Sequence, residues 1–164
     1  MGGIPKAGYQ VLRLLNRIGE RRVDAGEGWF VSRTDSTIQV YLYHYCHYDA
    51  LYRYRYQKLT NPHDAYKVFE NSGNLKIELE LCGLDAGVYR EESWTIDRTN
   101  GSTFDKWMEM GAPGVMTPED IAYLNDSAQP LCRIRDTDTA GVMRIEAELK
   151  PHEVRLVVLK KRDS

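Results

Sequence analysis

The chain has 164 residues, of which 42% are hydrophobic and 28% charged, and its formal net charge is −2. This length predicts one globular domain with at most a short appendage and excludes a complete (β/α)8 barrel, which typically needs about 250 residues. The near-neutral charge argues against nucleic acid or an anionic membrane as a partner.

The cysteines and the N-terminal residues indicate in which cellular compartment the protein is expected. Cys46, Cys82 and Cys132 are odd in number, far apart and without a C-x-x-C pair, so they are predicted to be free thiols in a reducing compartment. The first residues lack the apolar stretch of a signal peptide. We therefore expect a cytoplasmic location and no disulfide framework.

Residues 5–18 are predicted to form a helix. Pro5 suits the first helical turn, and Gly19 is expected to terminate the helix. The apolar residues recur at spacings of three and four and make one stripe, which must pack on something: Val11, Leu12, Leu15 and Ile18.

After Gly28 the hydrophobic period changes to that of β-strands. Alternation predicts a half-buried strand over residues 38–43, and residues 154–159 are almost continuously apolar, as expected for a central strand covered on both faces. The remaining predicted strands are residues 29–33, 75–82, 87–97, 132–135 and 143–150.

Two helical pieces interrupt the strands. Residues 104–110 form a short one, and Thr117 with Pro118 is a good helix start for a second that runs to about Asp126, with Ile121 and Leu124 facing inward. We therefore predict a mainly β protein, an antiparallel β-sandwich, with an N-terminal helix and a helical insertion at about residues 103–127.

A metal site is a weak prediction. His44, Cys46 and His47 lie close together, but their spacing fits no zinc pattern and a further ligand is missing. A strand end that runs into a polar loop is the simpler explanation of the three residues, so neither a metal nor another cofactor is expected.

A tyrosine–arginine tract is the main candidate for binding. If residues 52–56 are extended, Tyr52, Tyr54 and Tyr56 share one face, and a sugar could stack on their rings. The simpler interpretation is a packed tyrosine ladder on an outer strand. A stacking platform for single-stranded nucleic acid fits the acidic balance poorly.

No catalytic constellation stands out. Glycoside hydrolysis needs two carboxylates about 5–9.5 Å apart, whereas the adjacent pairs Glu91–Glu92 and Glu119–Asp120 point apart on a strand or belong to a helix start. Nucleophile-elbow, phosphate-loop and dinucleotide motifs are absent from the sequence. No catalytic residue is assigned.

Residues 94–118 read WTIDRTNGSTFDKWMEMGAPGVMTP. This stretch resembles the C-terminal region of glycoside hydrolase family 39, the β-xylosidases and their α-L-iduronidase relatives. Trp107, Met110, Gly111 and Pro113 match the family's W-x-x-M-G-x-P element, whereas Thr95 stands where the family usually has Arg.

Both ends of the chain support the resemblance. Residues 149–156 are similar to the family's closing L-x-P-x-x-V-x-L strand, residues 5–20 look like its last barrel helix, and His44 stands at the Asn of its Tyr-Asn-Tyr strand end. The resemblance implies residues 1–20 as a barrel-helix remnant and residues 21–164 as the β-sandwich that follows the catalytic barrel.

The resemblance also implies what this chain lacks. The family's acid/base glutamate lies in an Asn-Glu-Pro motif of the barrel, and this sequence contains no Asn-Glu dipeptide. The chain is therefore expected to be inactive alone, as a fragment or split product of an enzyme of xylan degradation. Its expected partner is the parent enzyme's barrel or a second copy of itself, reached through the N-terminal helix.

Two other hypotheses stay open. A free-standing module for xylo-oligosaccharides would use Tyr52, Tyr54 and Trp107 as stacking residues. A standalone enzyme would need a pocket of convergent polar groups that the sequence does not reveal.

Overall fold

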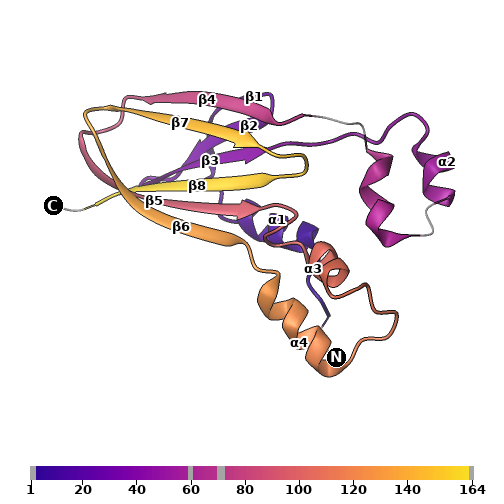
Figure 1. Cartoon of the computed structure of the whole chain (residues 1–164). Helices are drawn as coiled ribbons and strands as arrows, with labels where there is room; N and C mark the ends of the chain where they lie inside the picture. The colour runs from indigo at the N-terminus through magenta and orange to yellow at the C-terminus, as the bar shows by residue number, and fades with distance from the viewer. Residues whose placement is uncertain (1–2, 59–60, 70–72, 163–164) are drawn as a thin grey trace.

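The strands with the most regular alternation in the sequence form the smaller of two facing sheets. In the computed structural model, which describes residues 3–58, 61–69 and 73–162, β4 (Leu75–Cys82) pairs antiparallel with β7 (Val142–Leu149). Their apolar residues face the larger sheet, whose order is β1-β2-β3-β8-β5-β6. Figure 1 shows the two layers, and the mainly β, antiparallel sandwich is confirmed.

The larger sheet consists of six strands, all in antiparallel pairs. They are β1 (Arg21–Gly26), β2 (Trp29–Arg33), β3 (Thr37–Tyr43), β8 (Val154–Lys161), β5 (Gly87–Ile96) and β6 (Leu131–Thr139). The sequence analysis missed β1, whose residues are exposed and carry no apolar alternation, and it recognised only part of β6.

The middle of the larger sheet is covered on both faces. In β8, Val157 and Leu159 pack into the core between the sheets, while Leu156 packs on the opposite face. This confirms the doubly covered strand predicted from its continuous apolar run. The half-buried prediction for β3 was wrong, because Gln39 and Tyr41 are buried on the face that alternation assigned to solvent.

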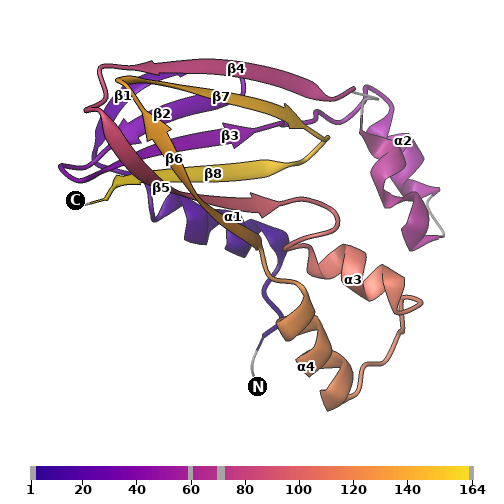
Figure 2. The same ribbon diagram turned by 60° about the vertical axis from the view of Figure 1, so that its left-hand side comes forward.

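That second face is covered by α1 (Ala7–Leu15), which Figure 2 shows lying across the sheet. Leu14 is only 3% exposed in the contact with Tyr41, Ile96 and Leu156, whereas Leu12, which we had placed on the inward stripe, is 60% exposed. The helix therefore buries most of its apolar stripe inside the domain.

Gly19 does not terminate α1, contrary to the prediction. The helix ends at Leu15, and the Gly19 amide donates to Ser32 Oγ and Gln39 Oε1 at 3.0 Å each. A Cβ at Gly19 would lie 2.4 Å from the Arg33 carbonyl carbon, so the close approach of two backbones requires glycine here.

The remaining helices gather at one end of the sandwich. They are α2 (Tyr52–Gln57), the 3-10 helix η1 (Pro62–Val68), α3 (Thr103–Glu109) and α4 (Pro118–Ser127). Thr117 caps the start of α4 and Leu124 is buried, both as predicted, while Ile121 is only half-buried. Asp120 adds a reciprocal bond to the Thr117 amide, which completes a capping box. No helix in the described ranges is long and apolar enough to cross a membrane.

Leu14→Ala is expected to lower the free energy of unfolding by about 2–5 kcal/mol, because it removes a buried side chain from the contact between α1 and the sheet. Leu12→Ala, in the same helix but largely exposed, should change it by less than about 0.5 kcal/mol. Urea denaturation of both variants measures the difference. Equal losses would show that α1 is not docked as described.

Candidate functional site

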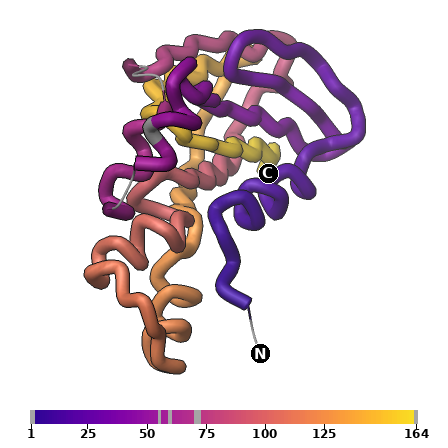
Figure 3. Tube along the Cα trace, turned by 90° about the vertical axis from the view of Figure 1, so that its right-hand side faces the viewer, coloured from indigo at the N-terminus to yellow at the C-terminus, as the bar shows by residue number. Residues whose placement is uncertain are grey.

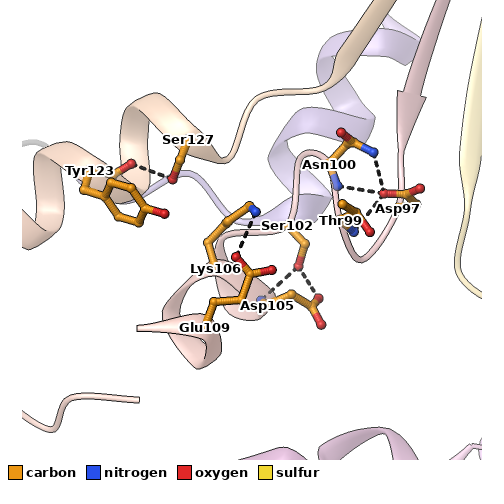
Figure 4. A network of polar contacts seen from close by, with 9 residues as sticks. All are labelled: Asp97, Thr99, Asn100, Ser102, Asp105, Lys106, Glu109, Tyr123 and Ser127. Atoms are coloured by element: carbon orange, nitrogen blue, oxygen red, sulfur yellow. Dashed lines mark hydrogen bonds and ion pairs between the residues drawn. The ribbon is translucent and has the colours of Figure 1, made fainter. Parts of the chain in front are cut away.

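The turn after β5 is built around Asp97. Its carboxylate Oδ1 accepts from the backbone amides of Thr99 (2.8 Å) and Asn100 (2.7 Å), as Figure 4 shows. Gly101 then takes a φ of 77°, and a Cβ there would press on Ile96 at 3.2 Å. The turn directs the chain from the sheet into α3.

At the start of α3, Asp105 is the centre of a buried polar network. Ser102 Oγ donates to its Oδ2 at 2.6 Å and accepts from its backbone amide, which makes Ser102 the helix cap. Tyr66 donates its hydroxyl to Oδ2 at 2.6 Å, and Arg98 Nε donates to Oδ1 at 3.0 Å. With three side-chain donors, this carboxylate holds structure together rather than being available for chemistry.

Tyr66 links η1 to α3 through this network. The Arg98 guanidinium lies 3.8 Å from the centre of the Tyr66 ring, and the ring also contacts Phe104. Burial, followed by the hydrogen bond to Asp105, raises the pKa of Tyr66 well above its ordinary value of 10. The hydroxyl therefore stays protonated and keeps donating to the carboxylate.

The turn between β7 and β8 contributes His152, which takes a φ of 64°. Its ring lies edge-on to Phe69 at 4.3 Å and near Tyr66 at 5.6 Å. Burial, with smaller contributions from His44 and Arg98, lowers the pKa of His152. The neutral ring therefore serves as apolar packing beneath η1.

An apolar groove of about 580 Å³ opens where η1, α3 and α4 meet the segment before α1. Figure 3 shows the N-terminal segment and α4 extending side by side from this end of the molecule. Six large side chains line the groove: Tyr66, Phe69, Phe104, Trp107, Met116 and Leu124. We call it the helical-end groove.

The polar atoms around the helical-end groove are largely paired within the domain. Thr103 Oγ1 donates to the Pro5 carbonyl at 3.0 Å, Trp107 Nε1 donates to the Pro113 carbonyl at 3.1 Å, and the Tyr66 hydroxyl is held by Asp105. The groove thus offers apolar surface but few hydrogen bonds. It fits apolar side chains of a protein better than the hydroxyl-covered faces of a sugar.

The three predicted carbohydrate contacts are not brought together in this groove. Trp107 lines it, but Tyr52 and Tyr54 lie in α2 and do not. The premise of an extended segment was wrong: residues 52–57 are helical, so Tyr52 and Tyr54 point to different sides, with Tyr52 stacked on Tyr48 at 4.6 Å. Sugar contact by these residues stays a prediction.

The other candidate clusters have structural explanations. Glu91 is buried against Arg135, whereas Glu92 pairs with Arg17 on the opposite face of β5. Among the residues that the structure describes, no three His, Cys, Asp or Glu side chains form a group able to hold a metal ion.

Sequence reasoning missed the residues that organise this end. The Ser102-x-x-Asp105 spacing is a readable cap signal, but nothing in the sequence pairs either residue with Tyr66, 39 positions away from Asp105. His152 was read only as part of the closing-strand match. These links depend on tertiary contacts.

Comparison with solved structures places the fold among family 39 glycoside hydrolases. A β-xylosidase from Caulobacter crescentus matches with a TM-score of 0.76 and 19% identity over 98% of this chain and 32% of that one. A family 39 enzyme from Xanthomonas axonopodis gives 0.75 and 14%, covering 98% and 31%. A bacterial orthologue of human α-L-iduronidase gives 0.68 and 17%, covering 97% and 28%.

Comparison of sequences gives a different context. HTH-type transcriptional regulators of Staphylococcus aureus are 23% identical over 157 residues, covering 93% of this chain and 19% of theirs. The chain thus spans about a fifth of the length of the curated relatives it matches. No family model matches it. The similarity to the solved enzymes therefore establishes the fold, not the activity.

Tyr66→Phe should lower the free energy of unfolding at neutral pH by about 1.5–3 kcal/mol, because Asp105 loses a hydrogen bond to a charged acceptor. The pKa of Tyr66 is raised in the folded state. The Tyr66 hydroxyl therefore contributes fully to the free energy of unfolding below pH 10, and this contribution is lost as the pH rises further. The gap between wild type and variant should therefore narrow above pH 10. Chemical denaturation over pH 7–11, with Tyr54→Phe as an exposed control, measures this gap, and a constant gap would contradict the network.

Proposed function

We propose that this chain is a non-catalytic accessory β-sandwich domain, of the kind that the family 39 resemblance implies after the barrel, and that it supports a neighbouring domain. The observation that carries the proposal is the fold similarity, which covers 98% of this chain but only 32% of a β-xylosidase. A likeness of this extent is what an accessory part of a larger protein would give.

The state of the carboxylates supports a non-catalytic role. In the pair Glu91–Glu92 the two side chains leave β5 on opposite faces, and each already has an arginine partner. Asp120 accepts from the Thr117 amide at the start of α4, and Asp105 accepts three side-chain hydrogen bonds. None of these groups is placed as an acid facing a nucleophile across a bound sugar.

The helical-end groove is the surface that we assign to the neighbouring domain. Phe104 at its wall is 38% exposed, and Val115, in the loop before α4, is 89% exposed. On α1 the docked stripe is unavailable, so a barrel or a second copy that binds this helix would contact Tyr9 and Leu12 on its outer side. Apolar surface of this kind marks protein contacts.

A second candidate follows from the curated sequences. Because the matched relatives are HTH-type transcriptional regulators, the same module could belong to a regulator instead of an enzyme. The coding sequence around this domain in its source DNA separates the two. An adjoining barrel with an Asn-Glu-Pro motif supports the enzyme, and an adjoining DNA-binding domain supports the regulator. A reading frame limited to this chain would contradict both.

The chain alone is expected to show no hydrolysis of an aryl β-xyloside, because Glu91, Glu92, Asp105 and Asp120 are each engaged in an ion pair or a helix cap. Release of the aryl group is measured spectrophotometrically with repurified protein. Activity that survives repurification and disappears when Asp105 or Glu91 is changed to the amide would refute the non-catalytic assignment.

The alternative of a free-standing xylan-binding module makes its own prediction. Calorimetric titration with xylo-oligosaccharides should then give saturable heat. The affinity obtained from it should fall about tenfold or more in Trp107→Ala or Tyr54→Ala. Lack of heat at millimolar sugar would leave the structural role. The paired polar atoms around Trp107 favour that second outcome.

A further inference from the structure

The smaller sheet covers only the middle of the larger one. Its two strands pack over the centre, and β5 and β6 continue beyond the edge of β7. A groove of about 530 Å³ runs along this edge. Its wall includes Ile145 and Ala147 of β7, and its floor includes Ser93, Arg133 and Val157 from three strands of the larger sheet. We call it the β7 groove.

The edge of β7 is open to a further strand. Within the described ranges β7 pairs with β4 alone, over eight consecutive residues without a bulge. Its sequence VMRIEAEL holds neither proline nor glycine, and the inward positions are all apolar. Natural edges are usually protected by a bulge, a proline or an inward charge, and β7 has none of the three.

We propose that the β7 groove binds one extended peptide segment, which adds to β7 as a third strand of the smaller sheet and comes from the neighbouring domain. This inference rests on the proposed function, because the neighbouring domain proposed there supplies the segment. Main-chain hydrogen bonds to β7 would give affinity, and the alternate side chains that point to the floor would give specificity.

The geometry favours a single strand over a second copy of the chain. Neighbouring strands lie about 4.8 Å apart, so the floor beyond β7, formed by β5 and β6, is wide enough to lie beneath an added strand. A second copy that paired its own β7 here would bring its six-stranded sheet into the layer that β5 and β6 already occupy. The larger sheet therefore excludes edge-to-edge dimers.

Charge defines the chemistry of the segment. On the floor, Arg135 is neutralised by Glu91 at 2.9 Å, whereas Arg133 makes no ion pair with any described residue. Beside them, the lining includes Ile145, Ala147 and Val157, which are buried in the core and make this part of the groove apolar. The segment should therefore point small apolar side chains inward, with one carboxylate opposite Arg133.

The outer edge of β4 is the natural comparison. The groove there is smaller, about 380 Å³ against about 530 Å³, and its lining includes Trp29 and Leu84. Added strands should therefore choose β7. Signals on β4 and on β7 can be told apart residue by residue.

The probe is a capped octapeptide, Thr-Val-Thr-Glu-Thr-Val-Thr-Val, whose valines and glutamate lie on one face when extended. Titrated into the isotope-labelled full chain, it should give saturable amide shifts on residues 143–148 and on Ser93 and Arg133. A peptide N-methylated at alternate positions, which cannot donate along one edge, should bind at least about tenfold more weakly.

Two variants of the chain sharpen the test. Arg133→Glu should weaken the peptide by about tenfold, whereas Arg144→Glu, a matched charge reversal on the outer face of β7, should change affinity less than about twofold. Shifts on residues 78–84, or no saturable shift at millimolar peptide, would overturn the proposal. Hydrolase activity would overturn only the accessory role, so the two failures are distinguishable.

Discussion

The fold depends on covering both faces of the two central strands, β3 and β8. A sheet buried on one side only would leave Tyr41, Ile96 and Leu156 in water, and at roughly 25 cal/mol per Å² of apolar area that exposure is costly. The smaller sheet covers one face and α1 covers the other. The helix is therefore part of the domain's core, whatever it adjoins in a longer protein.

This arrangement changes the meaning of the N-terminal stripe. Read alone, Val11, Leu15 and Ile18 suggest a helix in search of a partner, and the family resemblance supplies one, the barrel. In the structure these residues pack beside Leu14 on the sheet. An apolar groove remains at the helical end, where α1 begins and where η1, α3 and α4 converge.

Much of the fold could be predicted from local pattern, because the alternation in β4 and β7 and the continuous apolar run of β8 report burial directly. The exceptions have different causes. Gln39 is buried because it accepts from the Gly19 amide, 20 positions away, whereas Tyr52 lies in a helix and stacks on Tyr48, despite its alternation with arginine. The Tyr66–Asp105 hydrogen bond could not be predicted from the sequence, because it joins residues 39 positions apart, one in η1 and the other in the first turn of α3.

The contrast between fold and chemistry has a physical basis. A sandwich needs only alternating apolar residues and well-made turns, which sequences of 14–19% identity can supply equally well. Glycoside hydrolysis needs two carboxylates at a fixed separation, whereas here the buried acids Glu91, Asp105 and Glu153 each pair with an arginine. These three ion pairs join strands, helices and turns of the domain, and a shared sandwich fold does not by itself carry a shared chemistry.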